Sequence, residues 1–129
     1  MPLVRIDVVK GRSEEQVAAM LQALHDAMVQ AFEVPERDRY QVLTEHEPTR
    51  LILKDTGLGF VRSDERVLVQ VFTRPRSAEK KRMLYTLTSS LLEERLGIRP
   101  EDVMVVCVDN GDVDWSFAYG RPQFLTGEL

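Results

Sequence analysis

The chain has 129 residues, of which 43% are hydrophobic and 29% charged, and its formal net charge is −4. This length suits a single domain with its own hydrophobic core, and the negative charge gives no electrostatic support to binding of nucleic acids or anionic membranes. No apolar run approaches the ~20 residues of a membrane span, and His25 and His46 are too far apart in sequence to suggest a zinc site. The single Cys107 cannot form an internal disulfide, which is typical of a protein in the reducing cytoplasm.

The first half of the chain begins with a strand and a helix. Residues 3–9 are rich in β-branched side chains, which favours a strand. Ser13 and Gln16 have the spacing of a capping box, so we expect a helix to begin there and to end at about Glu33. One apolar stripe with helical spacing supports this helix: Val17, Met20, Leu21, Leu24, Met28 and Phe32.

A charged connector at residues 35–39 leads to the next predicted strand, at residues 40–45. Residues 47–65 contain Pro48, two glycines and scattered charges, so we expect a long loop. Within it, residues 51–53 are the candidate for a short additional strand.

The second half repeats this order of elements. Residues 66–73 show an alternating pattern and are rich in β-branched side chains, which predicts a strand. Ser77 caps a helix that ends at Gly97, a residue typical of the position just after a helix. The apolar run at residues 103–108 predicts a buried strand, with Cys107 in the core.

The two halves align along their length. Residues 10–13 fall on residues 74–77, and residues 34–36 fall on residues 99–101 after a slip of one position. This pattern indicates an internal β-α-β duplication, each half with a right-handed crossover. Two halves related by a pseudo-two-fold axis place their first strands antiparallel, so that Pro2 lies beside the exit of the strand at residues 66–73.

The Met1-Pro2 start can supply a catalytic amine. A small second residue normally allows removal of Met1, which would leave Pro2 as a secondary amine at the chain terminus. An α-amino group titrates at about 7.7–8.0, so a neighbouring charge can make it an acid or a base at neutral pH. The alternative is that Met-Pro begins the chain for no chemical reason.

The sequence Arg74-Pro75-Arg76 can bind a carboxylate. In extended chain, residues two apart point to the same side, roughly 6–7 Å apart, and two guanidinium groups can converge on one anion. The alternative is a solvated loop with two charges, but the duplication brings this pair next to Pro2. Asp38 lies in the charged connector, where it is either part of a surface ion-pair cluster or a partner of this site.

The tail at residues 110–129 has no helical period, and its aromatic residues occur at irregular intervals. Such a tail would be disordered unless its aromatic side chains were buried. We therefore expect them to cover a pocket or to pack on a neighbouring subunit.

These features together resemble the tautomerase superfamily, and within it the malonate semialdehyde decarboxylases. The resemblance extends over essentially the whole chain, and every matching stretch keeps the family pattern. The stretches are residues 34–42, 55–60, 74–76, 114–117 and 123–129, together with the Met1-Pro2 start.

The resemblance implies an α/β fold in which the two β-α-β units form a four-stranded mixed sheet with two helices on one face. It implies one domain over residues 1–129, with halves at about 1–60 and 66–129, which assembles as a homotrimer. It also implies an enzyme without a metal or organic cofactor. The single cysteine predicts a cytoplasmic location, and the charge and hydropathy predict no nucleic-acid or membrane partners.

The resemblance further assigns the site. Pro2 is the catalytic amine, Asp38 its carboxylate partner, and Arg74 and Arg76 bind the substrate carboxylate. An apolar wall completes the site: Trp115, Phe117 and Phe124.

The implied reaction is decarboxylation of a β-oxo acid, such as malonate semialdehyde to acetaldehyde and carbon dioxide, with hydration as a side activity. Two alternatives stay open. One is a tautomerase or hydratase of 2-oxo acids with neutral Pro2 as general base; the other is a trimeric binding relative without catalysis.

Overall fold

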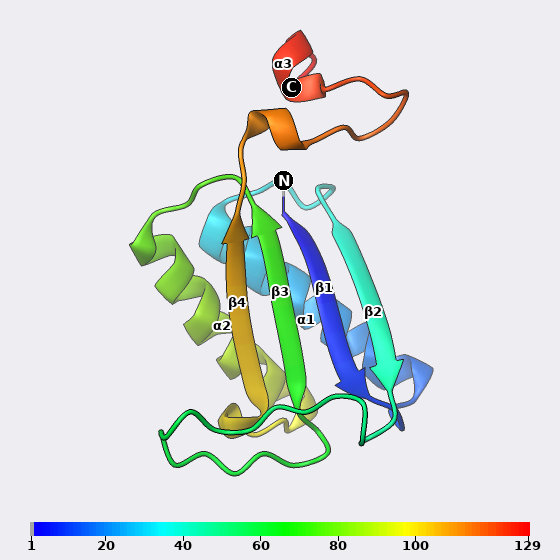
Figure 1. Ribbon diagram of the computed structural model, residues 1–129, viewed down its shortest axis with the longest axis vertical. Coiled ribbons are helices and arrows are strands. Elements are labelled where there is room, and N and C mark those ends of the chain that lie inside the picture. The colour runs from blue at the N-terminus through cyan, green and yellow to red at the C-terminus, as the bar shows by residue number, and fades with distance from the viewer. Residues whose placement is uncertain (1) are drawn as a thin grey trace.

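The computed structural model describes residues 2–129, and they form one four-stranded mixed sheet with two long helices on one of its faces (Figure 1). The first half consists of β1 (Leu3–Val9), α1 (Glu14–Phe32) and β2 (Tyr40–His46). The second half repeats it as β3 (Val67–Thr73), α2 (Ala78–Leu96) and β4 (Val103–Asp109). This is the predicted fold.

The strand register brings distant parts of the chain together at one end of the sheet. The strand order is β2-β1-β3-β4, with β1 parallel to β2, β3 parallel to β4, and β1 antiparallel to β3. Leu3 is paired with Tyr40 on one side and with Phe72 on the other. The start of β1, the start of β2 and the exits of β3 and β4 therefore meet at one end, and the tail folds over that end (Figure 1).

Capping explains where the long helices begin and end. The Ser13 hydroxyl accepts a hydrogen bond from the Gln16 amide, and the Gln16 side chain accepts one from the Ser13 amide, so the predicted capping box is present. Glu33 ends α1 in the left-handed conformation at φ 56°, and Gly97 ends α2 in the same way at φ 68°. Only glycine adopts that conformation without a steric cost, which is why the second helix stops where the sequence predicts.

The hydrophobic core lies between the helices and one face of the sheet. Alternate residues of β1 and β3 point into it, as the period of two in a strand requires. Its largest fully buried apolar side chains are Phe32, Ile6, Met20, Leu84, Leu92 and Ile98. Cys107 packs against this core but is only half-buried, because β4 is an edge strand of the chain.

No helix or strand formed by residues 2–129 packs across the other face of the sheet (Figure 1). It exposes large apolar side chains of the two edge strands, each 37–42% accessible: Tyr40, Val42, Met104, Val106 and Val108. The strand at residues 103–108, which we expected to be buried, is therefore half-buried on one face and exposed on the other. An apolar surface of this kind is typical of an interaction site.

The loop between β2 and β3 departs from the prediction, because residues 51–53 form no strand. The Arg66 side chain donates hydrogen bonds to backbone carbonyls of this loop. Its Nε donates to the Leu51 carbonyl at 2.8 Å and its Nη2 to the Pro48 carbonyl at 2.7 Å, so these carbonyls do not pair with another strand. Leu51 is buried, whereas Ile52 is exposed. Residues 51–53 therefore do not form a strand, and the buried Leu51 side chain anchors the loop.

The tail also departs from the prediction, because it contains two short helical elements. A 3-10 turn spans Asp112–Asp114, and the helix α3 spans Gln123–Thr126. The buried Gln123 holds the tail together, since its side chain accepts from the Phe117 amide at 2.9 Å and donates to the Ala118 carbonyl at 3.0 Å. Both elements are too short to have a detectable helical period.

Among residues 2–129, the structure contains no helix that is long and apolar enough to cross a membrane.

Candidate active site

The predicted catalytic residues emerge from three neighbouring strand ends. Pro2 is buried and directly precedes β1, at the level of Thr73 in the antiparallel register. Asp38 comes two residues before Tyr40, the first residue of β2, while Arg74 follows β3. The register thus places Pro2 between the two segments that carry Asp38 and the arginine pair. The prediction that Met1 is removed concerns a residue outside those described.

Arg76 is held from two sides. Its Nε donates to the Thr73 hydroxyl at 3.2 Å, and its Nη1 lies 3.5 Å from the Phe32 carbonyl oxygen. The guanidinium carbon also lies 5.0 Å from the centre of the Phe32 ring, a cation–π contact. Burial lowers the pKa of Arg76, the charge of Arg74 lowers it further, and Asp38 opposes both effects. The two arginines and Asp38 therefore act on one another electrostatically.

Arg74 points toward the tail. Its Nη1 donates to Oδ1 of Asp112 at 3.1 Å, and its guanidinium carbon lies 4.0 Å from the centre of the Phe124 ring. Its Nε is buried and has no hydrogen-bond partner among residues 2–129. A buried donor without a partner costs free energy, so this N–H is available to an anion entering the site.

Asp38 presents a buried acceptor that is also unoccupied. Its backbone N–H donates to the Pro35 carbonyl at 2.9 Å, which fixes the turn before β2. The same connector is tied to α1 by Nε2 of His25, which donates to the Glu36 carbonyl at 2.7 Å. Oδ2 of Asp38 is buried without a partner in the described part of the chain. This carboxylate oxygen can receive a proton donor such as an ammonium group.

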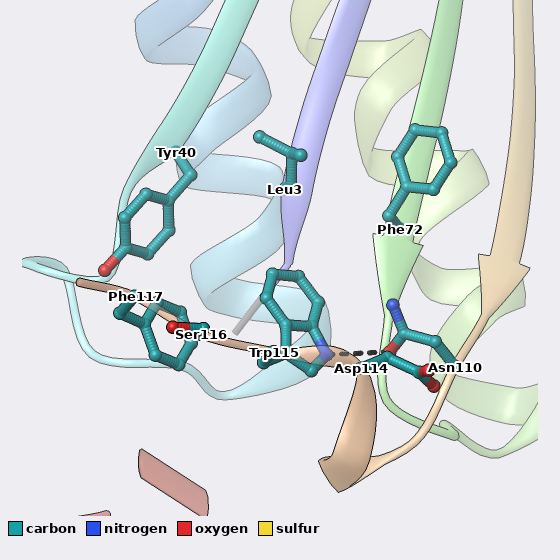
Figure 2. A pocket seen from close by; sticks show the side chains of 8 residues that line it. All are labelled: Leu3, Tyr40, Phe72, Asn110, Asp114, Trp115, Ser116 and Phe117. Atoms are coloured by element: carbon teal, nitrogen blue, oxygen red, sulfur yellow. Dashed lines mark hydrogen bonds between the residues drawn. The ribbon is translucent and has the colours of Figure 1, made fainter. Parts of the chain in front are cut away.

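The tail aromatics form the expected apolar wall. The rings of Trp115 and Phe117 are stacked at 5.6 Å, and Phe117 meets Phe124 edge-on at 5.5 Å. Nε1 of Trp115 donates to Oδ1 of Asn110 at 2.8 Å, so the polar end of the indole is satisfied (Figure 2). Sequence reasoning missed Tyr40, which extends this wall from β2 with its ring 5.7 Å from that of Phe117.

Two cavities lie on either side of the Tyr40–Phe117 pair. One has a volume of about 410 Å³ and lies below the ends of β1 and β3, between Leu3, Phe72 and Trp115 (Figure 2). The other, of about 390 Å³, is lined by Asp38 together with residues of the tail. The described lining of neither cavity includes Pro2, Arg74 or Arg76.

The described residues contain no group of three or more His, Cys, Asp or Glu side chains that could hold a metal ion. The chemistry that the residues of the candidate site offer is that of an amine, a carboxylate and two guanidinium groups next to an aromatic wall.

The fold, with its two fused β-α-β halves and a proline at the start of β1, is that of the tautomerases, and the chain belongs to this family. A family model described as tautomerase enzyme matches residues 38–118, and a second with the same description matches residues 2–60. The chain is 43% identical to the probable tautomerase YrdN of Bacillus subtilis (strain 168), over 100% of both chains. It is 33% identical to the probable tautomerase YusQ of the same strain, over 97% of this chain and 99% of the relative.

Solved structures give a finer comparison. A malonate semialdehyde decarboxylase, described as having decarboxylase and hydratase activities, superposes with a TM-score of 0.95 at 49% identity over 98% of each chain. The FG41 malonate semialdehyde decarboxylase inhibited by 3-bromopropiolate superposes with a TM-score of 0.93 at 41% identity, over 98% of this chain and 97% of that one. A symmetric trimer of fused 4-OT superposes with a TM-score of 0.76 at 27% identity, over 92% of this chain and 94% of that one.

Proposed function

We propose that the protein decarboxylates a β-oxo acid, such as malonate semialdehyde, through the Pro2 amine without a cofactor. The observation that carries this proposal is a pair of buried polar atoms that have no partner among residues 2–129: Nε of Arg74, a cationic donor, and Oδ2 of Asp38, an anionic acceptor. A substrate carboxylate complements the first and an ammonium group complements the second. The similarity to two malonate semialdehyde decarboxylases supports the same substrate class.

Decarboxylation breaks the bond between the carboxylate carbon and the neighbouring carbon, and the bonding electrons must move to the carbonyl. A cationic Pro2 stabilises the resulting enolate by hydrogen bonding to its oxygen, or Pro2 condenses with the aldehyde, losing water, to form an iminium that becomes an enamine. Carbon dioxide leaves without charge. A proton then adds to the carbon, and the iminium route ends with hydrolysis to acetaldehyde.

In this proposal the protein contributes orientation and environment. Arg74 and Arg76 hold the carboxylate out of the carbonyl plane, so that the breaking bond is aligned with the π system. Trp115, Phe117 and Phe124 exclude water from the side on which the carboxylate loses its charge, which favours formation of neutral carbon dioxide. Asp38 keeps Pro2 protonated, or activates a water molecule for a hydration side reaction.

A second candidate is a tautomerase or hydratase of 2-oxo acids, in which neutral Pro2 acts as general base. The names of the two curated relatives, both probable tautomerases, favour it. The same two residues, Arg74 and Arg76, which together form an arginine clamp, would bind the substrate carboxylate. Pro2, however, would have to be unprotonated at neutral pH.

We also propose that the protein is a homotrimer in the cytoplasm. The uncovered face of the sheet, with Val42, Met104 and Val106 exposed, offers an apolar surface that a second copy would bury. The similarity to a symmetric trimer of fused 4-OT supports three copies. Sedimentation analysis tests this assembly, and a stable monomer would contradict it.

The deciding experiment supplies purified protein with malonate semialdehyde and, separately, with an enolisable 2-oxo acid. We expect carbon dioxide and acetaldehyde from the first and little enol–keto exchange with the second. Borohydride added with the aldehyde separates the two routes, because only an iminium is trapped as a mass adduct on Pro2. Turnover of the 2-oxo acid alone would favour the second candidate, and turnover of neither would favour a binding protein.

A further inference from the structure

The site contains an acidic residue that the proposed reaction does not use. Oδ1 of Asp112 lies 3.1 Å from Nη1 of Arg74, and it approaches from the side of the tail. The centre of the Phe124 ring lies 4.0 Å from the guanidinium carbon, and Nε has no hydrogen-bond partner in the described part of the chain. Arg74 therefore meets a carboxylate of its own chain at one edge and keeps an N–H for a ligand.

The turn that carries Asp112 is built by hydrogen bonds to β3 and within itself. The Asn110 amide donates to the Thr73 carbonyl at 2.8 Å, which fixes the turn next to the arginine segment. Oδ2 of Asp114 accepts from the Gly111 amide at 2.7 Å, while the Asp114 amide donates to the Gly111 carbonyl at 3.0 Å. Backbone geometry thus presents Asp112 to Arg74, although both side chains are partly open to solvent.

The charges around the clamp nearly balance. Arg74 and Arg76 contribute two positive charges, and Asp38 and Asp112 contribute two negative ones. Arg37 and Glu128 add one of each sign at the cavity beside Asp38. A protonated Pro2 adds one positive charge, and Asp114 at the neighbouring cavity adds one negative charge, so the named groups leave no excess positive charge for a second carboxylate. A ligand with a second carboxylate would bring an uncompensated negative charge close to Asp112.

We infer that Asp112 is a specificity-determining residue that makes the clamp select oxo acids with one carboxylate over those with two. The inference rests on the proposed function for the role of Arg74 as a carboxylate-binding residue. Its physical basis is like-charge repulsion, which acts on every negative charge of the ligand and therefore penalises a dianion more than a monoanion. Asp112 also occupies one edge of Arg74, which a second carboxylate would otherwise use.

The test compares two ligands of nearly the same shape that differ by one charge: malonate and monomethyl malonate. Dissociation constants are measured by NMR titration at pH 7.5 for the wild type, Asp112→Asn and Glu47→Gln. The last is a matched control, because Glu47 also forms an exposed ion pair, with Lys10, but lies after the opposite end of β2. The asparagine keeps the shape of Asp112 and an oxygen that can still accept from Arg74.

We expect Asp112→Asn to tighten malonate binding by roughly five-fold relative to monomethyl malonate, as expected for one partly screened charge at this range. Glu47→Gln should leave the ratio of the two constants unchanged. In an Arg74→Ala background the effect of Asp112→Asn on the ratio should be much smaller, because the shared clamp is gone.

Equal tightening of both ligands, weaker binding of both, or no binding in any variant would overturn the inference. These outcomes are separate from failure of the proposed function, because the titrations need no turnover. A protein that does not decarboxylate can still show the charge-dependent ratio. Conversely, an active decarboxylase with an unchanged ratio would remove only the role of Asp112.

Discussion

The hydroxyl of Thr73 links the two arginines of the site: it accepts from Nε of Arg76 at 3.2 Å and donates to the Arg74 carbonyl at 2.9 Å. Thr73 is fully buried at the last position of β3. The strand thus orients the clamp through a side chain that faces the core, and its position can be tested without touching either arginine.

Thr73→Val keeps the β-branched shape and removes both hydrogen bonds. We expect it to lower the free energy of unfolding by about 1–3 kcal/mol, because buried polar groups are left unpaired, and to lower kcat/KM by misorienting Arg76. Thr88→Val on α2 is the matched control, since Thr88 is equally buried but belongs to the helix layer. Denaturant unfolding and steady-state kinetics measure both effects. If Thr73→Val loses stability but keeps kcat/KM, the hydroxyl does not orient Arg76.

The two arginines should differ in what they contribute to stability. Arg74→Ala and Arg76→Ala should each lose roughly 2–4 kcal/mol of transition-state stabilisation, the scale of one preorganised electrostatic contact. Arg74→Ala should cost less stability than Arg76→Ala, because its ion pair with Asp112 is partly exposed and its ring contact is with Phe124 of the tail, not with the core. Arg76→Ala should cost about 0.5–2 kcal/mol of stability as well, since it loses the contact with the Phe32 ring. Unchanged kcat/KM in either variant would show that the carboxylate binds elsewhere.

The sequence was sufficient for the parts of the site that regular structure positions. The duplication predicted antiparallel first strands, and the pairing of Leu3 with Phe72 is the contact that brings Pro2 beside the exit of β3. The capping box at Ser13 and the glycine cap at Gly97 gave the helix ends, because both signals are local. The placement of Asp38 near the same end follows from the parallel pairing of Leu3 with Tyr40.

The tail could not be predicted in the same way, because its contacts have no sequence period. The Arg74–Asp112 pair joins a strand exit to a 3-10 turn, and the ring of Phe124 reaches Arg74 from a four-residue helix. Asp102, just before β4, is a second example: it is fully buried and accepts from the Ser63 amide and hydroxyl, both at 2.6 Å, and no local pattern indicates this. Long-range pairing of polar side chains leaves no pattern in a single sequence.

The ion pair between the two helices predicts a pH-dependent contribution to stability. The hydrogen bond from Arg95, at 2.6 Å, holds the pKa of Asp26 below its ordinary value, against the opposing effect of burial. A carboxyl group whose pKa is depressed by folding stabilises the protein above its unfolded pKa, and this contribution is lost as the pH falls through the folded pKa. We expect Asp26→Asn to cost about 0.3–1 kcal/mol at pH 7, since the pair is partly exposed and screened.

The measurement is denaturant unfolding of Asp26→Asn and wild type at neutral pH and at a pH below the folded pKa of Asp26. The difference should shrink at acid pH, where the wild-type carboxyl group is protonated. Glu15→Gln, a change of the same kind at an exposed position of α1, serves as the control. A difference that stays constant with pH would mean that packing, and not charge, accounts for the loss.

The protonation state of Pro2 decides whether it acts as a cationic hydrogen-bond donor or as a neutral amine, and competing charges set it. Arg74 and Arg76 disfavour a cationic amine and lower its pKa, while Asp38 favours the cation and raises it. Asp112 offsets part of the charge of Arg74 at 3.1 Å, and Oδ2 of Asp38 is buried with no other partner among residues 2–129. We therefore expect Asp38 to prevail and Pro2 to be largely protonated at pH 7.

Titration of isotope-labelled Pro2 by NMR measures this pKa directly, in protein whose intact mass shows that Met1 has been removed. Activity should persist through neutral pH and fall on the alkaline side as Pro2 loses its proton. Asp38→Asn should move that alkaline limb to lower pH and reduce decarboxylation at pH 8, whereas Glu47→Gln, at the far end of the sheet, should leave the limb in place. An α-amino group ordinarily titrates at about 7.7–8.0. A wild-type pKa well below about 7 would mean that Pro2 is neutral at pH 7 and can act as a base, which would exclude the cationic mechanism. That result would leave the two reactions of a neutral Pro2, the tautomerase reaction and the iminium route of decarboxylation, which the borohydride trap distinguishes.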